Sequence, residues 1–146
     1  MPRKETITST MVRQHVVLHE ILVSLRFHAD MKGGTARALK ELEEYRKKEM
    51  LHISLEEKWL LPMARGAKEI GVASKIRKQH SVVPRLLEAI DEAIDQELDV
   101  HVPTTRLQNF MAEHLRLEEN MLYPEMDRRM RGAGAERLIR KLDVKL

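Results

Sequence analysis

The chain has 146 residues, of which 42% are hydrophobic and 34% charged, and its formal net charge is +3. This length suits one domain with one buried core. The sequence contains no cysteine, which excludes disulfides, zinc–thiolate sites, iron–sulfur clusters and a thiol nucleophile. Histidine and carboxylate side chains are therefore the only strong metal ligands that the chain can offer.

Hydropathy and the distribution of charge bear on the cellular location of the protein and on its partners. No apolar run reaches a membrane-spanning length and no signal-peptide pattern opens the chain, so we expect a cytoplasmic location and no membrane partner. Basic residues concentrate between Arg128 and Lys145. Because they form no dense patch with interleaved aromatic residues, we interpret them as a solvated helix surface and expect no nucleic-acid partner.

The first half of the chain shows two long helical patterns. Apolar residues at helical spacing predict a first helix over about Thr8–Met31, which Lys32–Gly34 ends. Thr35 is a plausible N-cap for the second helix, which continues to about Pro62 or Ala64.

A third helical pattern follows a break at Gly66–Gly71. Ser74 is the candidate N-cap, and the pattern ends at about Gln96. Pro84 lies inside it, where a proline should kink the helix or mark its true first turn.

The last part of the chain predicts a fourth helix and a short tail. Leu98–Pro103 indicates an extended connection, after which Thr104 or Thr105 caps a helix that reaches about Met130. Glycines at 132 and 134 break the pattern before a short amphipathic helix over 135–142. No strand pattern competes, so we predict an all-α protein, an antiparallel four-helix bundle closed by a short C-terminal helix.

One eleven-residue pattern occurs twice. HISLEEKWLLP begins at His52 and HLRLEENMLYP begins at His114, and both fit H-x-x-L-E-E-x-x-L-x-P. The helices before them also match, since Arg13-Gln14-His15 resembles Lys78-Gln79-His80. The chain is therefore predicted to be two similar helical hairpins, each with one His on its first helix and H-x-x-x-E on its second.

The spacing within the repeat predicts a metal site. Residues four apart lie on the same helix face, so His52 and Glu56 point in one direction, whereas Glu57 lies roughly 100° further round. His15 and His52 are equally far from the glycine turn, about 27 Å, and should lie at one level of the bundle.

Six side chains should therefore converge inside the bundle: His15, His52, Glu56, His80, His114 and Glu118. Burying so many polar groups without a partner is unfavourable, and a pair of metal ions would compensate them. Two bridging glutamates with two imidazoles for each ion suit iron or manganese better than magnesium or calcium, and zinc remains possible. His19, one turn after His15, is a possible additional ligand, but the repeat pairs it with Pro84 and so favours His15. Tyr123, close to the second motif, is more typical of packing than of chemistry.

Residues 8 to 130 resemble the hemerythrin family, specifically its HHE cation-binding branch. The motifs that carry the resemblance are His52-x-x-x-Glu56-Glu57 with Pro62 and the corresponding run from His114 to Pro124. It implies a single hemerythrin-like domain over 1–146, with a core over 8–130 folded as an up-and-down four-helix bundle and a short capping helix over 135–142. It also implies two non-haem iron ions with an oxo or hydroxo bridge, four terminal histidines and two bridging glutamates.

The chain departs from oxygen-carrying hemerythrins, which place a second His four residues after the first on the third helix. Here Pro84 occupies that position, and the missing ligand leaves one more open coordination site. This departure favours redox chemistry or iron handling over reversible oxygen carriage. Open positions on a buried iron pair nevertheless lead us to expect a di-iron protein that binds dioxygen or nitric oxide for sensing, storage or transfer.

Other functions stay open. An iron-handling protein and a di-iron redox enzyme that acts on peroxide, or in defence against nitrosative and oxidative stress, are the close alternatives. A metal-free bundle used only for protein contacts is the fourth hypothesis. Whether the protein is an enzyme, which residues would be catalytic and which protein partner it has are not determined by the sequence.

Overall fold

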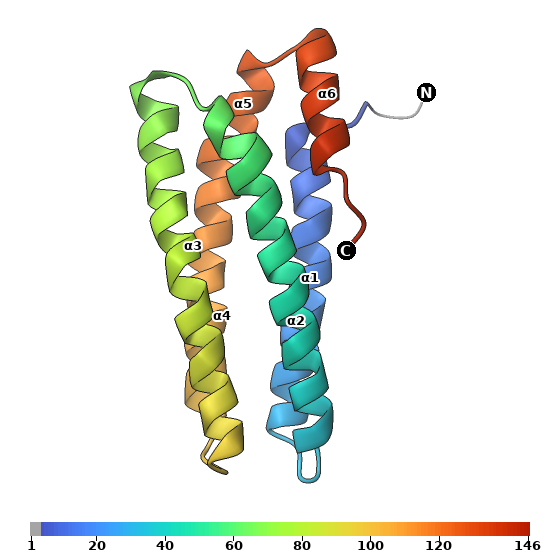
Figure 1. Cartoon of the computed structure of the whole chain (residues 1–146), viewed down its shortest axis with the longest axis vertical. Coiled ribbons are helices and arrows are strands. Elements are labelled where there is room, and N and C mark those ends of the chain that lie inside the picture. Colours follow the sequence, from blue (N-terminus) through green and yellow to red (C-terminus); the bar gives the residue numbers. More distant parts are fainter. Residues whose placement is uncertain (1–3) are drawn as a thin grey trace.

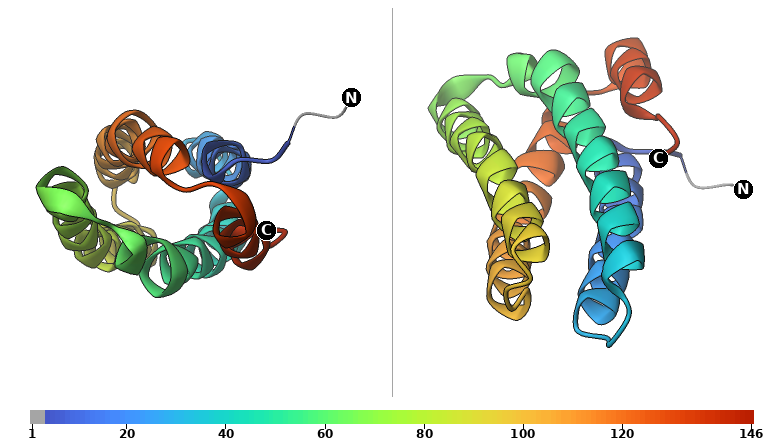
Figure 2. Two further views of the ribbon diagram at one scale, coloured as in Figure 1. Left: turned by 90° about the horizontal axis from the view of Figure 1, so that it is seen from above. Right: turned by 60° about the horizontal axis from the view of Figure 1, so that its bottom comes forward.

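The computed structural model describes residues 4–146, and all regular structure in that range is helical. Four long helices lie side by side, as Figure 1 shows: α1 (Ile7–Ala29), α2 (Thr35–Leu55), α3 (Gly66–Asp95) and α4 (His101–Leu117). Viewed along their length in Figure 2, they surround a common interior. The prediction of an all-α helical bundle is confirmed.

Short helical segments extend α2 and α4. A π-helical turn, η1 (Glu56–Leu60), and a 3₁₀ turn, η2 (Leu61–Met63), follow α2, whereas η3 (Glu118–Leu122), again π-helical, and α5 (Tyr123–Arg129) follow α4. α6 (Gly132–Leu142) packs against α1 and η1. Both α2 and α4 thus widen into a π turn at the same point of the repeated motif.

The prolines of the motif explain the two π turns. Pro62 and Pro124 lack an N–H, and their rings would clash with the carbonyl four residues earlier in a regular α-helix. The hydrogen-bond pattern of the helix shifts instead, so that the N–H of Leu61 donates to the carbonyl of Glu56, five residues earlier. In the second copy the N–H of Tyr123 donates to Glu118 in the same way. π turns of this kind are frequent at functional sites.

The turn between α1 and α2 depends on glycine. Gly33 has φ +81°, and a Cβ on Gly34 would lie 2.1 Å from the carbonyl oxygen of His28. The expected N-cap was wrong by one residue, because Gly34 holds that position and Thr35 is the first residue of α2.

The predicted start of the third helix was also wrong. α3 begins at Gly66, and both Gly71 and Ser74 lie within it. Glycine in a helix interior costs only about 1 kcal/mol, which packing of the apolar face can offset. The helix also continues through Pro84, which therefore does not mark its first turn.

The connection between α3 and α4 is shorter than predicted. α4 begins at His101, and neither Thr104 nor Thr105 caps it; the hydroxyl of Thr104 instead donates to the carbonyl of Val100 at 2.7 Å. The final helix, α6, likewise starts at Gly132 rather than Ala135. In both places a helix extends backward over residues that favour turns, because its apolar face still packs on the bundle.

The interior of the bundle has two apolar clusters. One contains Leu22, Leu42 and Leu87 from the half of the bundle nearer the α1–α2 turn. The other contains Met11, Leu60 and Ile76 from the half nearer α6. Between them lies a layer of buried polar side chains, which holds the candidate site. Among residues 4–146 no helix is both long and apolar enough to cross a membrane.

Candidate metal centre

The six side chains predicted to bind metal lie together in the polar layer. They come from all four long helices and the two π turns, and each is at most 3% exposed: His15, His52, Glu56, His80, His114 and Glu118. Each glutamate is the first residue of its π turn, one turn beyond the histidine of its motif.

The first hairpin brings its two histidines to one level, as their equal distance from the turn predicts. Nε2 of His15 lies 3.2 Å from Nε2 of His52. Nε2 of His52 is also 3.2 Å from Oε1 of Glu56, its partner within the motif. His15 reaches across to Oε1 of Glu118, again at 3.2 Å.

The second hairpin repeats this arrangement. The rings of His80 and His114 have centroids 5.0 Å apart. Nε2 of His114 lies 3.2 Å from Oε1 of Glu118, and Nε2 of His80 lies 3.3 Å from Oε1 of Glu56. The start of α4 at His101, earlier than predicted, supplies the helical length that brings His114 level with His80.

Both glutamates therefore contact histidines of both hairpins. The ligand atoms of Glu56, His80, His114 and Glu118 lie within 4.8 Å of one another, and so do those of His15, His52 and Glu118. The two groups overlap at Glu118, and their imidazoles and carboxylates have the composition of a metal-binding site.

Several inward-facing atoms of the cluster are buried without a hydrogen bond. They are Oε1 of Glu56, Nε2 of His80 and of His114, and both carboxylate oxygens of Glu118. Buried polar atoms are nearly always paired, and leaving them unpaired is costly. The close imidazole–carboxylate contacts without hydrogen-bond geometry are what a set of ligands around a cation would show.

Two glutamines hold the outer nitrogens of the motif histidines. Nδ1 of His52 lies 2.7 Å from Oε1 of Gln14, and Nδ1 of His114 lies 2.7 Å from Oε1 of Gln79. Because an amide oxygen can only accept, each Nδ1 carries a proton, so in the neutral imidazole the lone pair is on Nε2, which faces the cluster. Imidazoles oriented in this way are prepared for metal binding.

The second glutamate of each Glu-Glu pair faces the other hairpin. Oε2 of Glu119 lies 2.9 Å from Nδ1 of His15, whereas Oε2 of Glu57 lies 3.8 Å from Nδ1 of His80. Both glutamates thus lie beside the outer nitrogen of a histidine and not at the centre of the cluster, and Glu119 orients the candidate ligand His15. The crossed contacts give the centre an approximate two-fold symmetry.

The carboxylates strongly favour protonated imidazoles. Burial alone would lower the pKa of His15, but the nearby carboxylates of Glu118 and Glu119 outweigh it and raise the pKa to about 10. Burial opposes the charged form of His52 as well, yet the charge of Glu56 raises its pKa. A cation entering the site must displace these protons, so its binding would release them.

Tyr123 belongs to the site, although its sequence position favours a packing role. Its hydroxyl donates a 2.6 Å hydrogen bond to Oε2 of Glu56 and lies 3.2 Å from Nε2 of His15. The repeat offered a signal, because the corresponding residue of the first copy, before Pro62, is Leu61. Tyr123 thus makes the two halves of the centre different.

His19, the possible additional ligand, does not join the cluster. Its side chain is exposed on α1, whereas His15, one turn earlier, is buried. The repeat also favours His15, since Pro84 stands where a counterpart of His19 would be.

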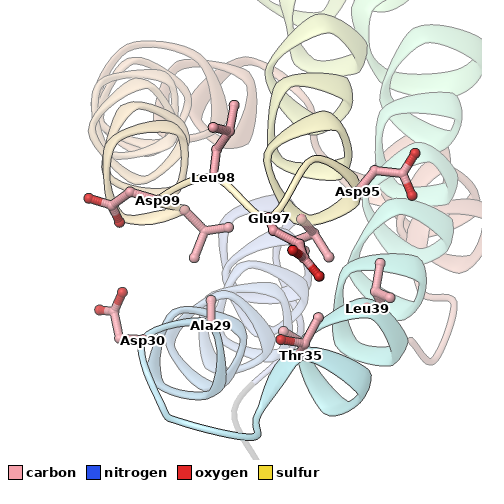
Figure 3. A pocket seen from close by; sticks show the side chains of 11 residues that line it. Ala29, Asp30, Thr35, Leu39, Asp95, Glu97, Leu98 and Asp99 are labelled. Atoms are coloured by element: carbon pink, nitrogen blue, oxygen red, sulfur yellow. The ribbon is translucent and has the colours of Figure 1, made fainter.

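A cavity of about 660 Å³ lies at the other end of the bundle. Figure 3 shows the carboxylates around it, which belong to Asp30, Asp95, Glu97 and Asp99. No histidine lines this cavity and none of the six clustered residues borders it. The buried cluster and this surface cavity are therefore separate features.

The fold and the cluster define a helical bundle with a candidate metal centre of imidazoles and carboxylates. The family model of the hemerythrin HHE cation-binding domain matches residues 6–126, and the chain belongs to this family. Neither a curated protein nor a solved structure matches the chain.

Proposed function

We propose that the chain is a non-haem di-iron protein that binds dioxygen or nitric oxide at the buried cluster. The observation that carries the proposal is the convergence of four Nε2 atoms and two glutamates on one interior space, with five of their atoms unpaired. Imidazole with carboxylate suits iron, and four imidazoles with two shared carboxylates would leave open positions on each ion. The family's up-and-down bundle is the arrangement expected around such a pair.

The residues divide into clear roles under this proposal. His15 and His52 would hold one ion, His80 and His114 the other, and Glu118 with Glu56 would join them. Bound ferrous iron would supply the position at which a diatomic ligand binds. The protein would keep the imidazole lone pairs inward, through Gln14 and Gln79, and would keep bulk water out, because the cluster lies between two apolar layers.

The test is anaerobic loading of the chelator-treated protein with ferrous iron, followed by rapid mixing with dioxygen or nitric oxide. We expect two ions per chain and a new visible absorption band with at least one of the two gases. Protein that takes up iron without changing its spectrum with either gas would contradict ligand binding. Protein that takes up no metal would contradict the metal centre itself.

A redox enzyme acting on peroxide is the second candidate, and Tyr123 favours it. Its buried hydroxyl, hydrogen-bonded to Glu56, places a proton donor directly beside the ligand groups. Steady peroxide consumption by the iron-loaded protein, reduced in Tyr123→Phe, would support this activity. Iron-loaded protein that leaves peroxide unconsumed would exclude it.

A further inference from the structure

Glu49 on α2 is a buried carboxylate without a partner. It is 1% exposed, and neither of its carboxylate oxygens makes a hydrogen bond within the described chain. The buried glutamates outside the cluster differ: Glu41, on the same helix, accepts a hydrogen bond from Ser24 and Glu69 binds Arg129. Burying an unpaired carboxylate is strongly unfavourable, so we expect Glu49 to bind a group that the protein itself does not supply.

The position of Glu49 on α2 orients its side chain toward the cluster of candidate ligands. Glu49, His52 and Glu56 are spaced three and four residues apart, so they share one face of the α2–η1 stretch. Glu56 lies one turn beyond His52 and Glu49 one turn before it. α2 and α4 run in the same direction (Figure 1), so Glu118 lies on the same side of the histidine layer as Glu56. Glu49 therefore approaches that layer from the opposite side.

The groups that affect the pKa of Glu49 are members of the cluster, which is consistent with a carboxylate that lies near the histidine layer. Burial raises its pKa, and the imidazoles of His52, His114 and His15 oppose that rise while Glu118 adds to it. These neighbours come from three different stretches of the bundle, α1, α2 and α4–η3. The carboxylate thus faces the centre of the bundle and not a single neighbouring helix.

Glu49 has no counterpart in the second hairpin. The residue three before His114 is Met111, which is 5% exposed and belongs to the apolar core. An unbranched apolar side chain of similar length therefore fits at the equivalent position. Packing therefore does not require a carboxylate at position 49, and the presence of Glu49 needs another explanation.

The charge of the proposed centre supplies that reason. Two divalent ions bring four positive charges into an apolar interior, and Glu56 with Glu118 compensates only two of them. Buried charge without compensation is costly, and the ion's own charge dominates such a site. A third carboxylate beside the histidine layer would halve the remaining excess.

We propose that Glu49 is a third carboxylate ligand of the metal pair, approaching from the side opposite Glu56 and Glu118. The proposal rests on the proposed function, since it needs a metal centre. It makes the donor set four imidazoles and three carboxylates, and it makes the two sides of the ion pair chemically different. The proposed ligand Glu49 lies outside the repeated eleven-residue motif, whose first copy begins at His52.

The experiment compares the wild type with Glu49→Gln and Glu49→Met. Chelator-treated proteins are titrated anaerobically with ferrous iron against a competing chromogenic chelator, and the metal-free proteins are melted in parallel. We expect both variants to bind at least one ion about 10–100-fold more weakly. Metal-free Glu49→Met should melt a few degrees higher than the wild type, because it no longer buries an unpaired carboxylate.

Glu41→Gln is the matched control, because Glu41 is a buried glutamate of α2 whose partners are Ser24 and His28. It should lower the melting temperature and leave iron affinity unchanged. X-ray absorption of the iron-loaded proteins should show fewer oxygen ligands in Glu49→Met than in the wild type.

Unchanged iron affinity in folded Glu49→Gln would overturn the proposal while leaving the metal centre intact. Loss of both affinity and metal-free stability in Glu49→Met would also overturn it, since that pattern belongs to a packing residue. A wild-type chain that binds no metal would instead overturn the proposed function.

Discussion

Gln14 links the candidate ligand His52 to the C-terminal end of the chain. Its amide oxygen lies 2.7 Å from Nδ1 of His52, and its amide nitrogen donates to the carbonyl of Leu142 at 2.7 Å. A weaker contact of 3.3 Å reaches the carbonyl of Val144. The C-terminal end of α6 therefore holds the side chain of Gln14 in place, and Gln14 in turn orients the imidazole of His52. Gln79, the counterpart in the second hairpin, instead lines a surface pocket.

Replacing Gln14 with alanine should weaken iron binding at the first hairpin. Without the amide, Nδ1 of His52 loses its acceptor and the ring loses its fixed orientation, which typically costs about 10–100-fold in metal affinity. Anaerobic competition titration measures the change. Gln108→Ala is the control, because that glutamine pairs with Arg26 away from the cluster. Equal affinities for the wild type and Gln14→Ala would show that this contact does not prepare the ligand.

Tyr123→Phe should destabilise the metal-free protein. The change removes the donor that satisfies Oε2 of Glu56 and leaves a buried carboxylate oxygen unpaired, at an expected cost of about 1–3 kcal/mol. Urea unfolding of the chelator-treated protein measures it. Tyr45→Phe serves as the control, because Tyr45 is equally buried and its hydroxyl makes no hydrogen bond within residues 4–146. Similar losses in both variants would mean that the Glu56 contact contributes nothing specific.

The sequence predicts the elements well where the pattern is periodic and poorly where it relies on single residues. The extents of α1 and of the helical stretch through η2 are close to those predicted. The predicted start of α3 at Ser74 is too late, because Gly71 suggests a break that the helix does not make. Packing of a long apolar face overrides the weak preferences of glycine and threonine, and this competition is not visible in a local pattern.

The candidate ligands can be predicted because the chain contains the motif twice. The repeat identifies the face of each helix and helical rise identifies the level, so the sequence alone places His15 and His52 together. Tyr123 and Glu49 differ from their counterparts in the other copy of the repeat. Such a mismatch marks the position but does not say what the residue does. Their burial next to the cluster depends on how the two hairpins pack together, which the sequence does not show.

Glu118→Ala should affect metal binding more than His15→Ala. Glu118 belongs to both groups of clustered ligand atoms, whereas His15 belongs to one. We therefore expect Glu118→Ala to lose both ions and His15→Ala to retain one at the His80–His114 side. Iron content after desalting measures the stoichiometry. His19→Ala should retain two ions, because that side chain is exposed. Loss of an ion in His19→Ala would contradict the assignment of His15.

The ion pair between Glu69 and Arg129 should make stability depend on pH. Nε of Arg129 donates to Oε2 of Glu69 at 2.9 Å, and Nη2 donates to Oε1 at 2.8 Å and to the carbonyl of Met63 at 2.6 Å. The pair thus ties α3 to α5 and η2. Hydrogen bonds from Arg129 lower the pKa of Glu69 from its ordinary value of 4.5, despite partial burial.

Because the pKa of Glu69 is lower in the folded protein than in the unfolded chain, its contribution to stability is fully present above about pH 4.5. It disappears as the pH falls through the folded-state pKa and the carboxylate takes up a proton. Glu69→Gln should therefore cost about 1–3 kcal/mol at pH 7, and the difference from the wild type should shrink as the pH is lowered to about 3. Urea unfolding of the metal-free proteins at both pH values measures the difference. Glu136→Gln, which removes an exposed pair with Lys4, should cost less than about 1 kcal/mol at either pH. A Glu69→Gln deficit that stays constant between the two pH values would mean that Glu69 stabilises the fold by packing and not by its charge.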